Sequence, residues 1–281
     1  MAKYCALAVA TGYWKPSENF ESKICEALAG KVLDGDFVVV SEKAVSTALG
    51  CMVDESQVTP SRTAKLIARF WMRIGWGIFL GSICHFGNRL NRRLREYPLD
   101  TGSRHKQVAL QYAGFSQALM FGSEGAIDGS NLPYSYVSMP LENSAEVAQK
   151  IQRHIQATLN KRVCVVIVDT DKTYQFRNFY FTPRPRPLCG IHSFGGTATY
   201  VFGRMFKFKR SSTPLAVAGC SLPAKEALKI ANIADRARGP GSGATVWDMA
   251  ARFQVQVSGV SYEMLAKIRH KPIVIVRKTL G

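Results

Sequence analysis

The stretch that decides the fold is Arg-Val-Cys-Val-Val-Ile-Val-Asp-Thr, residues 162–170. Its continuous apolar run is rich in β-branched residues, which predicts a strand buried on both faces. The run ends in Asp169 and Thr170. A carboxylate at the end of a buried strand is a frequent place for chemistry, because ligands of α/β sheets bind at that edge.

A second run of this kind, Phe-Val-Val-Val at residues 37–40, follows the turn signal Asp-Gly-Asp and leads into Ser-Glu-Lys. Segments with helical periodicity lie between the predicted strands. We expect helices from Ser144 toward Leu159 and over residues 223–236 and 246–253. Strands and helices are mixed along the whole chain, and no short repeat recurs. The pattern predicts an α+β (mixed α/β) fold with mixed sheets and flanking helices.

The composition favours a folded, basic protein. Its 281 residues are 47% hydrophobic, and 37 basic against 20 acidic residues give a formal charge of +17. Such a surface attracts phosphates, nucleic acids or anionic membranes, and the charge alone does not choose among them. The sequence has no zinc-finger, RRM or KH signature, so binding of nucleic acid would rest on charge alone.

The cysteines are scattered singly, without a zinc-ligand spacing. Their odd number and dispersion predict reduced thiols, and the N-terminus lacks the apolar core of a secretory signal, so we expect a cytoplasmic protein. The seven are Cys5, Cys25, Cys51, Cys84, Cys164, Cys189 and Cys220.

Residues 59–104 differ in character from the rest of the chain. The uncharged run at residues 74–86 is flanked on both sides by arginines, as in a membrane-touching hairpin. It is shorter than the roughly 20 apolar residues of a spanning helix, and three glycines weaken it as a helix. We therefore expect a core or dimer-interface segment, with no membrane contact through residues 74–95; surface attachment is the alternative.

Polar side chains concentrate in two loops, Gly-Ala-Ile-Asp-Gly-Ser-Asn-Leu-Pro at residues 125–133 and the strand end at Asp169. Magnesium and manganese prefer carboxylate, hydroxyl and phosphate oxygens. Asp128 and Asp169 would supply the carboxylates, while further groups would complete or orient the shell: Ser130, Thr170 and the Asn131 amide. An ordinary Asx turn is the alternative for the first loop.

Five motifs occur in an order that resembles the coenzyme F420:L-glutamate (γ-glutamyl) ligase family. They span about two thirds of the chain: GDFVVVSEKAVSTALG (residues 35–50), GAIDGSNLP (125–133), ENSAEVAQKI (142–151), VVIVDT (165–170) and VFGR (201–204). The resemblance implies that family's fold, in a divergent archaeal-type paralogue. It implies a nucleotide- and metal-binding core at residues 1–220, with residues 59–104 inserted, and residues 221–281 completing the fold.

The resemblance also implies an activity: a GTP-dependent ligase, assembled as a homodimer, that joins L-glutamate or a similar amino acid to a carboxylate-bearing acceptor. The terminal phosphoryl group would pass to the acceptor carboxylate, and the amine would attack the acyl phosphate, with Mg²⁺ or Mn²⁺ bridging the phosphates. Asp128 and Asp169 match positions that are catalytic and bind metal in that family, and Thr170 matches a further metal ligand. The implied nucleotide or substrate contacts are Lys43, Ser46, Ser130, Asn131 and Arg177.

The chain departs from the family after the Asp-Thr pair, where only Arg177 and Asn178 remain of a longer segment. Acidic positions further on are replaced near Cys220 and at Arg238. An acceptor other than the deazaflavin cofactor is therefore expected. The alternative function is a protein on the same fold that binds RNA or another phosphate ligand without ligase activity, which the +17 charge would support.

Overall fold

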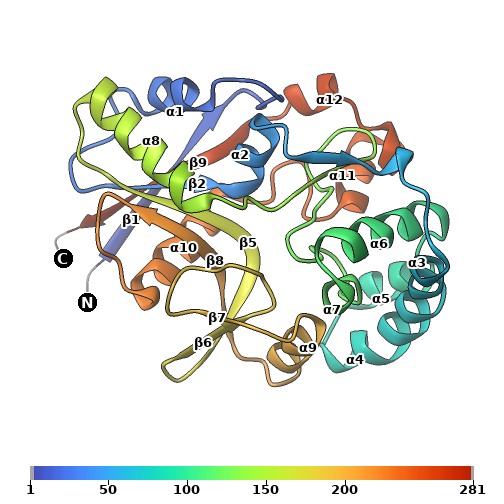
Figure 1. The fold of residues 1–281 in the computed structure, drawn as a ribbon. Helices are drawn as coiled ribbons and strands as arrows, with labels where there is room; N and C mark the ends of the chain where they lie inside the picture. The colour runs from blue at the N-terminus through green and yellow to red at the C-terminus, as the bar shows by residue number, and fades with distance from the viewer. Residues whose placement is uncertain (1–2, 280–281) are drawn as a thin grey trace.

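The structure is a computed structural model and describes residues 3–279 (Figure 1). Within these residues the main sheet has seven strands in the order β1-β9-β2-β5-β6-β7, with β8 paired to β5. They are β1 (Lys3–Thr11), β2 (Phe37–Ser41), β5 (Cys164–Phe176), β6 (Phe179–Thr182), β7 (His192–Ser193), β8 (Lys209–Ala218) and β9 (His270–Thr279). A small second sheet pairs β3 (Met52–Asp54) with β4 (Tyr136–Ser138).

The two apolar runs of the sequence lie side by side at the centre of the main sheet. β2 and β5 are parallel, from Phe37 opposite Cys164 to Ser41 opposite Val168. Their neighbours β9 and β8 are antiparallel to them. Because parallel strands end at the same edge, the residues after Ser41 and the carboxylate of Asp169 meet there.

Helices cover both faces of this sheet. The core on one face joins Val38 and Ile167 to α1 (Phe20–Leu28) and α8 (Ser144–Leu159). On the other face Val39 and Val166 pack against α10 (Ala224–Arg238). Alternate residues of β2 and β5 thus enter opposite cores, as expected of strands buried on both sides. The expected α+β class is confirmed.

A helical lobe stands beside the sheet and is closed by its own core around Trp76 (Figure 1). Most of it comes from the segment that differs in composition. Its elements are α3 (Arg62–Leu66), the π-helix η2 (Ile67–Leu80), α4 (Gly81–Ile83), α5 (Asn88–Arg95), α6 (Asp100–Tyr112) and α7 (Phe115–Ala118).

Two glycines of the lobe serve packing and do not break the helix, contrary to expectation. Arg62–Ile83 is one continuous helix of 22 residues. A Cβ at Gly77 would lie 2.9 Å from the backbone nitrogen of Arg95, and one at Gly81 would lie 2.2 Å from the Asn91 side chain. The missing side chains therefore let α5 approach η2 and α4.

The remaining elements surround the carboxyl edge of the sheet. They are α2 (Glu42–Ala48), η1 (Glu55–Gln57), α9 (Thr197–Met205), α11 (Val246–Phe253), η3 (Val257–Gly259) and α12 (Tyr262–Ala266). α9 packs against α4 and α7 of the lobe and against β6 of the sheet, so it joins the two parts of the molecule.

One expectation about the cysteines is wrong. Cys164 and Cys220 form a disulfide, with their Cα atoms 5.4 Å apart. β5 and β8 pair with Val165 opposite Ala218, and this register brings the two distant thiols together at the strand ends. The other five cysteines are free.

Candidate active site

A cavity of about 1190 Å³ lies at the carboxyl edge of the sheet and extends to the helical lobe. The strand ends of β2 and β5, the 127–131 loop, residues 238–247 and α6 all contribute to its wall. Of the residues expected to act, Lys43, Asp128, Ser130, Asn131, Asp169 and Thr170 line it.

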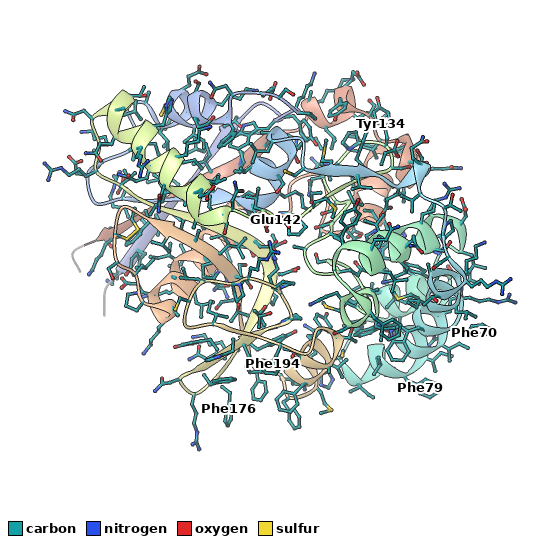
Figure 2. The ribbon with its side chains drawn as sticks, viewed as in Figure 1. Phe70, Phe79, Tyr134, Glu142, Phe176 and Phe194 are labelled. Atoms are coloured by element: carbon teal, nitrogen blue, oxygen red, sulfur yellow. A yellow bond between two sulfur atoms is a disulfide. The ribbon has the colours of Figure 1, made fainter. Side chains whose placement is uncertain are left out.

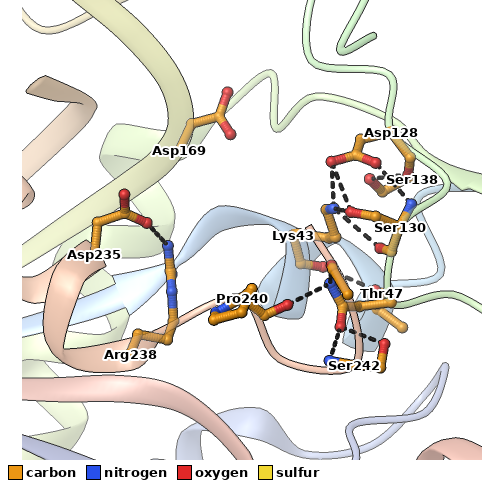
Figure 3. Close-up of polar contacts among 12 residues, drawn as sticks. Lys43, Thr47, Asp128, Ser130, Ser138, Asp169, Asp235, Arg238, Pro240 and Ser242 are labelled. Carbon is orange, nitrogen blue, oxygen red and sulfur yellow. Dashed lines mark hydrogen bonds and ion pairs between the residues drawn. The ribbon is translucent and has the colours of Figure 1, made fainter. Parts of the chain in front are cut away.

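The 127–131 loop and α2 form the first polar group of the cavity (Figure 3). Asp128 is anchored to Ser138 of β4 by backbone hydrogen bonds in both directions. Its Oδ1 accepts from the Ser130 amide at 2.6 Å, and its Oδ2 accepts from Lys43 Nζ at 2.5 Å. Lys43 Nζ also donates to Ser130 Oγ at 2.7 Å. Lys43, Asp128 and Ser130, predicted separately, therefore form one cluster.

The second group forms around Asp169. Arg184 Nε donates to Asp169 Oδ2 at 2.7 Å, and Arg184 Nη2 donates to Glu42 Oε1 at 2.6 Å. The Arg184 side chain is 2% exposed. Burial raises the pKa of Glu42 above its ordinary range, although the charge of Arg184 opposes this rise. One buried guanidinium thus balances carboxylates from the ends of both central strands.

Arg184 was not anticipated, because its setting, Pro-Arg-Pro-Arg-Pro at residues 183–187, is typical of an exposed extended segment. That expectation is wrong at Arg184, which turns into the molecule. It fits at Arg186, whose side chain is 65% exposed. Proline excludes the segment from a strand ladder but does not determine where the intervening side chains point.

Asp171 adds a third carboxyl to the same region. Burial, and then the negative charge of Asp169, raise its pKa well above the ordinary range, with a smaller contribution from Asp128. These interactions place the three carboxyl groups within electrostatic reach of one another. In Figure 3 the side chains of Asp128 and Asp169 point toward the same space from opposite sides. The region thus holds four carboxyl groups, including Glu42, but among the described residues only two cations pair with them, Lys43 and Arg184.

The third group lies on α10 and the loop that follows it. Asp235 accepts from Lys172 Nζ at 3.0 Å, from Ser212 Oγ at 2.7 Å and from Arg238 Nη2 at 2.9 Å. Burial would raise the pKa of Asp235, but Lys172, Ser212 and Arg238 together lower it. Lys172, Asp235 and Arg238 all line the cavity. Two cations therefore stand on this wall, of which Figure 3 shows Arg238 bonded to Asp235.

Three of the expected contacts have other positions. Asn131 accepts from the Ser242 amide and hydroxyl, both at 2.6 Å, and so fixes the 240–243 loop. Ser46 is fully buried on α2, outside the cavity lining. Arg177 is exposed on the turn between β5 and β6, with a left-handed φ of 52°. The structure does not bring Ser46 or Arg177 to the cavity.

The far wall carries a buried ion cluster on α6. His105 bonds through Nδ1 to Glu55 at 2.6 Å and through Nε2 to Glu124 at 2.8 Å. Lys106 is fully buried and pairs with Glu124. Burial alone would lower the pKa of His105, but Glu55 and Glu124 raise it well above the ordinary range. The cluster is therefore charge-balanced and fixes the lobe side of the cavity.

Comparison with known proteins gives the family of this chain. The model of a family described as F420-0:Gamma-glutamyl ligase matches residues 8–198, which include Lys43, Asp128 and Asp169. The chain is also 33% identical over 284 positions to the uncharacterized protein MJ1361 of Methanocaldococcus jannaschii, across 97% of this chain and 96% of that one. The resemblance drawn from the sequence motifs is confirmed: the chain belongs to the F420-0:gamma-glutamyl ligase family.

Proposed function

We propose that this protein is a GTP-dependent, divalent-metal-dependent amide ligase that joins L-glutamate, or a similar amino acid, to a carboxylate-bearing acceptor. The family is one of ligases. The observation that carries the finer assignment is that Asp128 of the 127–131 loop and Asp169 of β5, 41 residues apart in the chain, line one cavity together with the cations of the opposite wall. Phosphoryl transfer depends on this combination of metal-binding carboxylates and phosphate-binding cations.

The carboxylates suit a hard cation that binds with the nucleotide. Among residues 3–279 no group of three or more His, Cys, Asp or Glu side chains is arranged as a complete metal site. Mg²⁺ commonly needs only one or two carboxylates, because phosphate oxygens and waters complete its shell. Asp128, Asp169 and the Thr170 hydroxyl would hold it, and when bound it would offset the negative charge of the phosphates. The surplus of carboxyl groups around Asp171 supports this assignment.

The chain's own residues would position the reactants. Lys43 holds Asp128 and Ser130 in place and offers a positive charge at the strand edge, while Lys172 and Arg238 offer two more from the Asp235 wall. A triphosphate would lie between these walls. Transfer of its terminal phosphoryl group to the acceptor carboxylate gives an acyl phosphate and GDP. The amine of the amino acid then forms the amide bond and releases phosphate. The homodimer remains a prediction.

Calorimetric titration of GTP into the protein with Mn²⁺, followed by a product assay with L-glutamate and candidate acceptors, tests the proposal. We expect Asp128→Asn and Asp169→Asn to abolish turnover. Asp34→Asn is the matched control, because exposed Asp34 accepts the Arg162 amide through Oδ1, which asparagine retains. A protein that binds no GTP in the presence of Mn²⁺, or retains turnover in both site variants, would not be this enzyme.

A further inference from the structure

Exposed apolar side chains gather on one edge of the molecule. Nineteen large hydrophobic side chains are exposed in the described residues, and twelve of them belong to two segments. One set projects from the long helix of the lobe: Leu66, Phe70, Ile74, Ile78, Phe79 and Ile83. The other lies on and around α9 and the β5–β6 turn: Phe176, Phe179, Phe194, Phe202, Met205 and Phe206. We call these twelve residues the apolar edge.

The two sets adjoin where α9 packs against α4. Arg204 Nη2 donates to the Cys84 carbonyl at 2.9 Å, and His85 Nε2 lies 3.4 Å from the Met205 carbonyl. In Figure 2 the labelled Phe70, Phe79, Phe176 and Phe194 follow the right and lower margin of the molecule. The contacts make the apolar edge one surface of the lobe and the sheet.

The two chain segments that supply the apolar edge are rich in basic residues. Residues 62–95 contain eight Lys or Arg and residues 172–225 contain nine, and neither segment has an Asp or Glu. Removing these 17 cations from the 37 leaves 20 basic against 20 acidic residues in the rest of the chain. The net charge of +17 therefore resides in the two segments that supply the apolar edge. Not every one of these cations lies on the edge, because Lys172 and Arg184 face inward and Arg89 and Arg93 pair with Asp248.

The long helix has the character of a helix that lies on a membrane surface. By length and composition Arg62–Ile83 is apolar enough to span a bilayer. Its inner side, however, is packed in the lobe, where Met72 and Trp76 are fully buried. The outer side presents an apolar stripe next to Lys65 and Arg69. An apolar stripe beside Lys and Arg is typical of helices that bind anionic bilayers in the interfacial plane.

We propose that the apolar edge docks on the surface of an anionic lipid bilayer. Charge argues against a second copy, because a two-fold contact would bring the basic residues beside the apolar stripe, such as Lys65 and Arg69, against those of the other copy. An RNA partner would account for the cations and some phenylalanines, but not for the exposed leucine and isoleucines. The expectation of a core or dimer-interface segment thus holds for one side of the helix only. This inference does not depend on the ligase assignment.

Vesicle flotation with the full chain tests the inference. We expect binding to phosphatidylcholine vesicles that contain phosphatidylglycerol, and little binding without it. Phe79 and Phe206 are 61% and 54% exposed, so Phe79→Ser with Phe206→Ser leaves the core intact. Loss of about tenfold in partitioning per phenylalanine gives a decrease on the order of 100-fold. Leu7→Ser with Leu33→Ser, 52% and 49% exposed on the sheet body, is the control and should bind as the unaltered chain does.

Charge reversal tests the second component. Lys65→Glu with Arg69→Glu should weaken binding on the order of tenfold or more. Circular dichroism establishes that each variant is folded. Unaltered protein that stays in the soluble fraction with anionic vesicles, or a folded phenylalanine variant that floats equally well, overturns the inference. If the protein binds no vesicles but is a dimer in light scattering, and the phenylalanine or charge-reversal substitutions dissociate this dimer, the edge is an interface with a second copy. If it binds no vesicles but binds tRNA, and the substitutions weaken tRNA binding, the edge is an RNA-binding surface.

Discussion

Replacing Arg184 by methionine should be among the most destabilising substitutions in this chain. Arg184 is the cation that Asp169 and Glu42 share, and the Glu42 side chain is 4% exposed. Methionine keeps most of the volume but removes the guanidinium, so two carboxylates lose their nearest positive charge. Breaking a buried pair by removing one partner costs about 3–5 kcal/mol. With an unfolding entropy of about 2.1 cal/mol/K per residue, that corresponds for 281 residues to a Tm lower by roughly 5–9 °C.

The same sequence motif supplies the control. Arg186 lies two residues away between the same prolines, but its side chain is 65% exposed and its 3.5 Å pair with Glu142 is also exposed. Arg186→Met should therefore change stability by less than about 1 kcal/mol. In the double variant Glu42→Gln with Arg184→Met, part of the lost stability should return, because one uncompensated charge is removed.

Thermal and urea unfolding of the four proteins give the comparison, with secondary structure checked by circular dichroism. The reasoning requires a large difference between Arg184→Met and Arg186→Met. If the two variants unfold at the same temperature, Arg184 is not the buried partner of both carboxylates, and the electrostatic account of the site is refuted.

Two further predictions concern stability. The positive charges of Lys106 and His105 outweigh burial and lower the pKa of Glu124 from its ordinary 4.5 to about 2. Glu124 thus contributes stability above pH 4.5, on the order of 3 kcal/mol, that is lost as the pH falls toward 2. Urea unfolding between pH 4.5 and pH 2 should show that the unaltered protein loses its extra free energy of unfolding over Glu124→Gln. A difference in free energy that stays constant with pH would contradict this. Glu26→Gln, at an exposed position, is the control. Gly81→Ala should lower the free energy of unfolding by about 1–3 kcal/mol, because its Cβ would lie 2.6 Å from the Trp76 carbonyl oxygen. Gly12→Ala is the control and should be nearly neutral, because no atom lies within 4 Å of the added Cβ. Equal melting temperatures of the two variants would refute the packing argument.

The carboxylates could be predicted because strand geometry fixes them. A buried β-branched run must end at the sheet edge, and parallel pairing with β2 places Asp169 beside the segment that carries Lys43. Asp171 is a carboxyl group of the site that the sequence analysis did not predict, although its position in the sequence suggested it. β5 continues past Thr170, so Asp171 lies on the same strand as Asp169, although the pairing with β8 shifts register between Asp169 and Lys172.

Contacts that depend on local conformation could not be predicted in the same way. No helix is predicted from the sequence immediately after the strand at residues 37–40, but α2 begins at Glu42. In a helix, side chains four residues apart lie on one side, so Lys43 and Thr47 line the cavity while Ser46 is buried. Arg184 depended on how a proline-rich segment folds back over the sheet, which has no periodic signature.

The distribution of charge separates the two proposed roles within one fold. Outside residues 62–95 and 172–225 the chain is neutral, and Asp128, Asp169 and Asp235 belong to that neutral part. A uniformly positive surface would draw polyanions to the cavity mouth and to the edge alike. Exposed cations beside the apolar stripe, such as Lys65 and Arg69, instead let a bilayer bind there while the cavity keeps its carboxylates available to a metal. α9 lies at the boundary, with Tyr200 lining the cavity and Phe202 exposed on the edge, so a membrane contact would lie within one helix of the site.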